Sequence, residues 1–264
     1  MYTFDRAIVK EVPETLDRGL TSADLGSPDY GRARQQHSRY VEVLTECGVE
    51  VTVLDAEHEL PDSVFVEDTA VVTEEFVMLT NPGAETRRPE VQGIAGTLQE
   101  WYGEVERIQP PGTLEGGDVL HVGGRFYIGL TRRTNREGAR QLADALGRHG
   151  YGATVVALRE FLHLKTGIAY LGDGNLVVAG ELADHGDFEH FNRIVVPPEE
   201  EYCANCIRVN DHVMVPAGYD VTPEKISAQG YEIEEIDMSE FQKVDGGLSC
   251  LSLRMRRRPE TSAE

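Results

Sequence analysis

The sequence predicts a mixed α/β fold, a five-bladed pseudo-symmetric propeller of repeated ββαβ units, in one domain spanning residues 1–264. Three observations support this prediction. Several helix-like stretches end at glycine and lead directly into a strand, a hairpin pattern recurs between these stretches, and a final strand pattern can pair with the first one. The competing prediction, an open α/β sheet, has little support because the glycine-rich dinucleotide and phosphate-loop motifs are both absent.

Glycine marks the ends of the predicted helices, because only glycine adopts a left-handed backbone without a steric penalty. Thr134 with Glu137 reads as a capping box, and Thr222 followed by Pro223 reads as an N-cap. The repeat period is roughly 45 residues, with one missing glycine where a strand at 193–196 fills the gap. The helices are predicted at residues 29–47, 88–102, 134–149 and 222–229, and the strands that follow them at 49–54, 104–108, 153–158 and 231–236.

Hairpins lie between these units, and their turns contain residues that tolerate positive φ. A last strand at 247–255 is expected to pair with residues 4–12 and so to close the ring. The hairpins are predicted at residues 66–80, 114–130, 163–179 and 203–216, with turns such as Gly123-Gly124 and Asn210-Asp211.

The charge balance is strongly acidic, with 46 Asp and Glu residues against 25 Lys and Arg residues and a net charge of −21. Such a field repels phosphates and anionic lipid, so we expect neither nucleic acid nor a membrane as a partner. It attracts a small cation, although acidity also serves solubility. Lysine occurs only at positions 10, 165, 225 and 243, which suggests a salt-adapted source. No apolar run or signal pattern indicates a membrane span or secretion, so a cytoplasmic location is expected.

The four cysteines include one CxxC motif, Cys203 to Cys206. A structural zinc would need two further ligands at suitable spacing, and the sequence has no second CxxC. His185 and His190 lie nearby in the sequence, yet the pattern favours neither a metal nor a cofactor.

One position of the repeat has a polar or reactive residue in several units. Counting back from each hairpin turn gives Glu67, Glu115 and His163, and the last strand contributes Cys250. Each of them alone is compatible with a structural role, and Cys250 alone could be an apolar filler. In a ring, however, they meet at the axis, where a thiol, an imidazole and carboxylates can act as nucleophile, proton shuttle and cation cradle.

Four segments resemble the dimethylarginine dimethylaminohydrolase family of the guanidino-group-modifying, or pentein, superfamily. The resemblance covers nearly the whole chain in order, and it implies the same five-bladed propeller. Lys165 departs from the arginine deiminases, which typically have Asp two residues after the histidine. The segments are residues 61–70 (PDSVFVEDTA), 113–119 (TLEGGDV), 162–165 (LHLK) and 243–252 (KVDGGLSCLS).

The resemblance implies hydrolysis of methylated arginine to citrulline through a covalent thiouronium intermediate. It implies that Cys250 is the nucleophile and His163 the general acid/base, with no cofactor. Asp68 and Glu115 would accept hydrogen bonds from the guanidinium group. The further implied substrate-binding positions are Asp62, Glu67 and, as an apolar wall, Phe65, whereas Asp118 reads as support for a turn.

Arg87 and Arg133 match the arginines that bind the substrate carboxylate in the family, although Arg88 and Arg132 leave the register open by one residue. The backbone carbonyl groups of Leu20 and Val244 match positions that bind the substrate ammonium group, and the loop around Leu20 would close as a lid.

Two alternatives remain open from the sequence. One is hydrolysis of free arginine or another guanidine such as agmatine, and the other is a non-catalytic member of the superfamily, such as a ribosome anti-association factor. The second class lacks the cysteine, histidine and carboxylate set. The expected partner is a small cationic guanidino compound, and the protein is expected to be a monomer or a homodimer.

Overall fold

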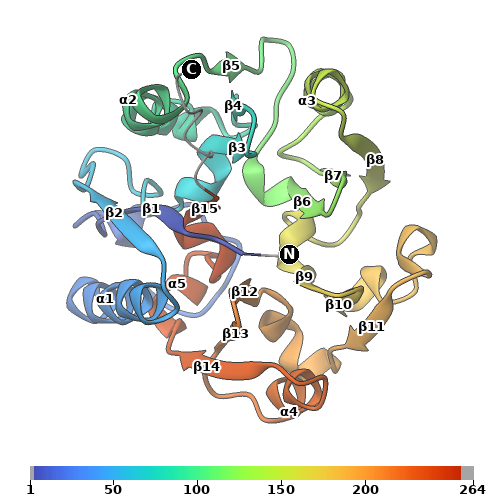
Figure 1. Cartoon of the computed structure of the whole chain (residues 1–264). Coiled ribbons are helices and arrows are strands. Elements are labelled where there is room, and N and C mark those ends of the chain that lie inside the picture. The colour runs from blue at the N-terminus through green and yellow to red at the C-terminus, as the bar shows by residue number, and fades with distance from the viewer. Residues whose placement is uncertain (1–2, 257–264) are drawn as a thin grey trace, which may run out of the picture.

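The computed structural model describes residues 3–256 and shows five three-stranded sheets arranged in a ring around a central axis (Figure 1). The predicted propeller is therefore confirmed. The sheets are, in order of their strands from the axis outward, β15-β1-β2, β3-β4-β5, β6-β7-β8, β9-β10-β11 and β12-β13-β14.

Every sheet has the same internal topology. The inner strand pairs antiparallel with the middle strand, and the middle strand pairs parallel with the outer one. A parallel pair needs a crossover connection, which explains why a helix or a set of helical turns separates the middle and outer strands. The strands are β1 (Arg6–Lys10), β2 (Glu50–Leu54), β3 (Ala70–Val72), β4 (Val77–Leu79), β5 (Glu106–Arg107), β6 (Val119–Val122), β7 (Arg125–Leu130), β8 (Gly152–Ala157), β9 (Ile168–Gly172), β10 (Asn175–Val178), β11 (Asn192–Val195), β12 (Ile207–Val209), β13 (His212–Pro216), β14 (Glu232–Ile236) and β15 (Leu253–Met255).

Four crossover helices lie on the rim of the ring: α1 (Tyr30–Glu46), α2 (Glu90–Tyr102), α3 (Arg136–Arg148) and α4 (Val221–Ser227). In the fourth module, short 3-10 turns replace the helix, in agreement with the missing glycine signal there. The short helix α5 (Ser239–Gln242) precedes the last inner strand. No helix within residues 3–256 is long and apolar enough to cross a membrane.

In the modules that have a crossover helix, apolar side chains of the sheet pack against it, as Leu79 does with Ile94 and Leu98, all fully buried in one cluster. Burial of this kind stabilises each module by roughly 25 cal/mol per Å² of apolar surface removed from water. The ring closes where β15 pairs antiparallel with β1, with Ile8 opposite Leu253. The predicted pairing of the two ends of the sequence is thus confirmed.

The predicted inner strands differ from the structure at their first residues, which form short 3-10 turns. These turns are η2 (Val66–Thr69), η4 (Gly116–Asp118), η5 (Leu164–Thr166), η8 (Pro198–Ala204) and η9 (Ser249–Leu251). Each turn brings at least one polar side chain close to the axis, and the strand begins only after it.

Two predicted helix caps are wrong. The N-cap of α3 is Asn135, whose side chain accepts the Gly138 N–H group, because the Thr134 hydroxyl group instead accepts the N–H group of Glu115. The N-cap of α4 is Asp220 rather than Thr222, and the buried carboxylate of Glu200 accepts the first N–H groups of that helix.

Candidate active site

One small cavity lies at the end of the axis where the 3-10 turns converge. It collects all of the residues predicted for the site except Glu67 and Glu115. Leu162, Asp245 and Gly246 also line it and were not predicted, although Leu162 and Asp245 are each next to a predicted residue in the sequence and Gly246 is two residues from Val244. The lining residues are Leu20, Asp62, Phe65, Asp68, Arg87, Arg133, Leu162, His163, Val244, Asp245, Gly246 and Cys250.

His163 precedes η5 and is 6% exposed. Its Nε2 atom lies 2.7 Å from Glu115 Oε2 and 3.9 Å from Asp68 Oδ1. Gly117 leaves room for the ring, because a Cβ atom there would lie 2.7 Å from Nδ1. Burial by itself lowers the pKa of His163, but Asp68, Asp118 and Glu115 outweigh burial and raise this pKa to about 9. The imidazole is therefore protonated at neutral pH.

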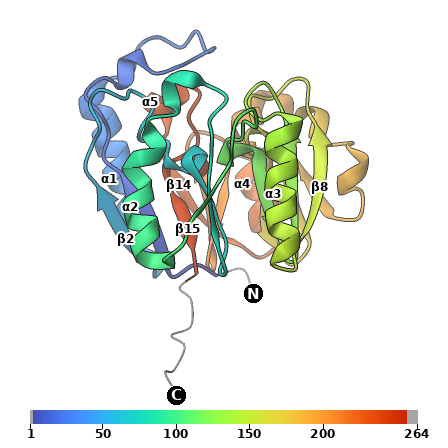
Figure 2. The same ribbon diagram turned by 90° about the horizontal axis from the view of Figure 1, so that it is seen from above.

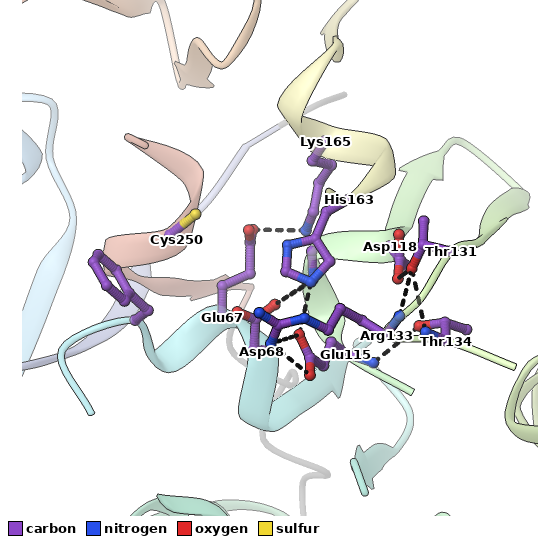
Figure 3. Close-up of polar contacts among 12 residues, drawn as sticks. Glu67, Asp68, Glu115, Asp118, Thr131, Arg133, Thr134, His163, Lys165 and Cys250 are labelled. Atoms are coloured by element: carbon purple, nitrogen blue, oxygen red, sulfur yellow. Dashed lines mark hydrogen bonds and ion pairs between the residues drawn. The ribbon is translucent and has the colours of Figure 1, made fainter. Parts of the chain in front are cut away.

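Asp68 and Glu115, both buried, already bind cationic groups of the chain itself (Figure 3). Asp68 accepts the Gly117 N–H group at 2.8 Å and pairs with Arg87 at 2.6 Å. Glu115 pairs with Arg133 at 3.3 Å in addition to His163. Although burial raises the pKa of both carboxyl groups, these cations outweigh it and lower both pKa values. Glu115 contacts the imidazole but does not line the cavity.

Of the two pairs of neighbouring arginines, one member of each lines the cavity. Arg87 and Arg133 line the cavity, whereas the side chain of Arg88 is 41% exposed and Arg132 is also exposed. Arg87 donates to Asp68, to Glu90 and to the backbone carbonyl group of Phe65, so most of its N–H groups already have acceptors. Arg133 makes its contacts with Glu115 through Nη1.

Cys250 lies in η9, and its backbone N–H group donates to the carbonyl group of Gly247 at 3.1 Å. Burial, Glu67 and Asp68 raise the pKa of the thiol to about 12, against a smaller opposing effect of Lys165. The thiol is therefore neutral until a cation enters the cavity. A positively charged substrate a few ångströms away would favour the thiolate.

Asn205, the residue after η8, connects two of the turns at the axis and was not predicted. Its side chain accepts the N–H group of Ser249 at 2.9 Å and donates to Ser249 Oγ and to the carbonyl group of Lys165. It thereby completes the ring of polar residues, one from each module. The only sequence signal for it was its place in the CxxC segment just before β12 (Ile207–Val209).

Glu67 faces away from this cavity. Its carboxylate pairs with Lys165 at 2.6 Å and accepts the Ser249 hydroxyl group at 2.8 Å. Glu67 and Lys165 both line a second cavity that opens from the opposite end of the axis. The structure therefore places Glu67 below the predicted site, next to the Cys250 turn, rather than in the cavity.

The loop that follows η1 (Leu16–Arg18) contributes Leu20 to the cavity wall and is visible at the upper edge of Figure 2. Leu20 donates its N–H group to Asp62 at 3.0 Å, and Ser22 donates its N–H group to Asp245 at 2.7 Å. Asp245 adopts a left-handed backbone with φ of 56°. Two carboxylates of the cavity wall therefore hold this loop in place.

Asp68, Glu115 and His163 could each offer one ligand atom to a metal ion, since these atoms lie within 4.8 Å of one another. Two arginines already neutralise the two carboxylates, so the donor set is poor for a further cation. Cys203 and Cys206 are buried free thiols packed in an apolar cluster, and among residues 3–256 they are not part of such a group of ligands.

The fold matches solved structures closely. Over 96% of this chain and 100% of the other chain, it superposes with TM-scores of 0.95 and 0.94 on two dimethylarginine dimethylaminohydrolase structures at 49% identity. One is a Cys-to-Ser variant of the Pseudomonas aeruginosa protein complexed with citrulline, and the other is a His-to-Gly variant as an adduct with S-methyl-L-thiocitrulline. The fold and the site together define a pentein-type hydrolase.

Sequence comparison gives the family. A model described as eukaryotic N,N dimethylarginine dimethylhydrolase matches residues 29–184. The chain is 50% identical over 252 residues to the N(G),N(G)-dimethylarginine dimethylaminohydrolase of Pseudomonas aeruginosa, covering 95% of this chain and 99% of that one. A protein of the same name from Streptomyces coelicolor is 34% identical, covering 95% and 97%. This chain belongs to the dimethylarginine dimethylaminohydrolase family.

Proposed function

We propose that this protein hydrolyses Nω-methylated arginines, asymmetric dimethylarginine and monomethylarginine, to citrulline and dimethylamine or methylamine. One observation supports this most directly. The thiol of Cys250 and the protonated imidazole of His163 line the same cavity, whose other walls include three carboxylates, Asp62, Asp68 and Asp245. The family relationship and the citrulline complex of the Pseudomonas aeruginosa protein support the same substrate class.

The cation of the substrate starts the reaction in this proposal. Its approach lowers the pKa of the Cys250 thiol, which loses its proton to solvent. The thiolate then forms a bond to the guanidinium carbon and gives a tetrahedral adduct. A guanidinium carbon is a poor electrophile, and a covalent route divides the displacement into two easier steps.

His163 acts next as the general acid. Its imidazolium proton goes to the leaving nitrogen as the carbon–nitrogen bond breaks, because an amine anion cannot leave. An S-alkylthiouronium intermediate remains on Cys250. The neutral imidazole then accepts a proton from water, the resulting hydroxide adds to the same carbon, and the carbon–sulfur bond breaks to release citrulline. Glu115, 2.7 Å from Nε2, holds the ring and stabilises its charged form.

Substrate binding is distributed around the cavity. Asp68 and Asp62 would accept hydrogen bonds from the guanidinium and ammonium groups, with Glu67 acting through the Cys250 turn. The backbone carbonyl groups of Leu20 and Val244 would accept from the ammonium group. Arg133, with Arg87 behind it, would bind the carboxylate, and Phe65 would pack near the methyl groups.

A substrate panel tests the proposal. We expect purified protein to form citrulline from asymmetric dimethylarginine faster than from arginine, and to leave agmatine unchanged. Citrulline and amine release are measured side by side. A preference for free arginine would assign the protein to the deiminase activity instead.

Two variants test the roles. Cys250→Ser is expected to abolish turnover, and His163→Gly to lower it by about 10³-fold or more while the fold persists. Cys47→Ser is the matched control, because Cys47 is also a free thiol but lies outside the cavity. Normal turnover by Cys250→Ser would remove the nucleophile assignment.

The remaining expectations form part of this proposal. We place the protein in the cytoplasm as one catalytic domain, either a monomer or a homodimer. Its only assigned partner is a small cationic guanidino compound, and a net charge of −21 disfavours nucleic acid and anionic membranes.

A further inference from the structure

Asp118 is a fully buried carboxylate that the reaction above does not use. It lies at the end of η4 and does not line the cavity, so it cannot touch a substrate there. It is packed tightly against β7, because a Cβ atom at Gly129 would lie 2.9 Å from its Oδ1 atom. A buried charge is costly unless hydrogen bonds compensate it, so its partners indicate its role.

Each oxygen of Asp118 binds a different loop of the site, and Figure 3 shows Asp118 beside Thr131. Oδ1 accepts the N–H group of Leu164, the residue after His163, at 2.9 Å. Oδ2 accepts the hydroxyl group of Thr131 at 2.8 Å. The Thr134 hydroxyl group is a third donor to this carboxylate. One side chain therefore joins the loop of His163 to the turn between β7 and α3.

The two threonines extend this connection to further site residues. Thr131 Oγ1 accepts the N–H groups of Arg133 at 3.0 Å and of Thr134 at 3.2 Å. With both lone pairs occupied, its proton has to go to Asp118. Thr134 Oγ1 in turn accepts the N–H group of Glu115 at 3.1 Å. Because these donors converge on it, the position requires an ionised carboxylate and not an amide.

From this geometry we propose that Asp118 is a positioning residue, which fixes His163, Arg133 and Glu115 relative to one another and supplies negative charge behind the imidazole. The expected effects of Asp118 on kcat and KM rest on the proposed function, whereas its expected effect on the pKa of the His163 imidazole does not. The carboxylate makes no hydrogen bond to the His163 ring, so it acts on that ring through its charge alone.

Several charged groups face His163, and Asp118 is one of the three that favour the imidazolium. Although burial raises the pKa of Asp118 to about 6, the group is mostly ionised at pH 7. The groups around the ring are Asp68 from η2, Glu115 and Asp118 from η4, Arg133 from the turn after β7, Arg87 behind Asp68, Lys165 from η5 and Cys250 from η9.

Asp118→Asn tests the charge while keeping the shape of the side chain. We expect the pKa of His163, followed by NMR of a labelled imidazole, to fall by about one pH unit. A general acid with a raised pKa works below that pKa and fails above it. The high-pH limb of kcat, near pH 9 in the parent, should therefore move to lower pH by the same amount.

Thr131→Val tests the positioning. It removes the acceptor of the Arg133 N–H group, so we expect KM for dimethylarginine to rise about tenfold. It also removes one donor to Asp118, so the pKa of His163 should fall by less than in Asp118→Asn, where the whole charge is lost. Glu200→Gln is the matched control. Glu200 is likewise a buried carboxylate that accepts several N–H groups, at α4 and away from the cavity, and its loss should lower stability without moving the His163 titration.

Two results would overturn the proposal. One is a folded Asp118→Asn protein in which His163 titrates at the parent pH. The other, decisive even if that variant does not fold, is a Thr131→Val protein with parental KM. If the parent turned over no guanidine at all, the proposed function would fail, yet the NMR titration would still decide whether Asp118 controls the imidazole.

Discussion

Arg87 illustrates how a residue predicted to bind substrate can already have its hydrogen-bond donors paired with acceptors of its own chain. It is 5% exposed, and its guanidinium group pairs with Asp68 at 2.6 Å and with Glu90 at 2.8 Å. Burial raises the pKa of Glu90 to about 7 despite this pairing. The site therefore depends on Arg87 for the position of Asp68 first, and for any contact with substrate only second.

Arg87→Met is expected to destabilise the protein by about 3–5 kcal/mol, because it leaves two buried carboxylates without their cation. Urea unfolding measures this difference. Arg88→Met is the control, since Arg88 is largely exposed and its loss should change the unfolding free energy by about 0.5 kcal/mol or less. If Arg87→Met raised KM and left stability unchanged, Arg87 would be a substrate anchor only.

The five 3-10 turns are the elements that make the site. Four of them contain or adjoin Glu67, Glu115, His163 and Cys250, and Asn205 follows the fifth. Asn205 ties η9 to η5 through three hydrogen bonds. Because the thiol and the imidazole come from separate modules, such cross-connections set their relative position.

Asn205→Ala should slow the reaction of Cys250 with a haloamidine probe by about tenfold, because the N–H group of Ser249 loses its buried acceptor and the turn loosens. Mass spectrometry of the labelled protein follows the rate. Asn192→Ala, which removes an exposed side chain on β11, serves as the control and should react at the parental rate. Parental labelling of Asn205→Ala would show that η9 keeps its position without this residue.

The sequence predicted the modules, because their signals are local. Gly48, Gly103, Gly150 and Gly230 all have positive φ, as the helix ends required. The 3-10 turns before the inner strands were predicted as parts of those strands. Contacts with other modules across the axis bend the chain there, and the local sequence does not reveal such contacts. The hydroxyl group of Thr134 illustrates the same limit, because a local capping box competes with a distant N–H group that the sequence does not reveal.

The residues of the candidate site were predictable from the sequence, but the pairings of their side chains were not. The repeat, together with the family resemblance, identified nine of the twelve residues that line the cavity. It could not show that Asp68 and Glu115 are neutralised by Arg87 and Arg133, nor that Glu67 faces the opposite cavity. These pairings are long-range, and a periodicity fixes which residues approach the axis but not which way each side chain turns.

At the scale of the whole molecule, the net charge of −21 sets a general repulsion that salt screens. We expect the melting temperature to rise by about 4 °C between 0.05 and 1 M NaCl at pH 7.5, on the order of 1–2 kcal/mol for a domain of this size. Differential scanning calorimetry measures it. Near the isoelectric point, about 4.7, the same salt step should have little effect. A melting temperature that does not change with salt at pH 7.5 would contradict both this repulsion and a salt-adapted source.

The pairing of β15 with β1 has a consequence for the order in which the protein becomes active during synthesis. The ribosome makes most of the acidic and basic groups of the pocket long before residue 250, and β1 has no antiparallel neighbour until residues 253–255 have been made. A nascent chain can thus fold four modules and still have no thiol at its centre. Activity begins only when the last strand completes the circle.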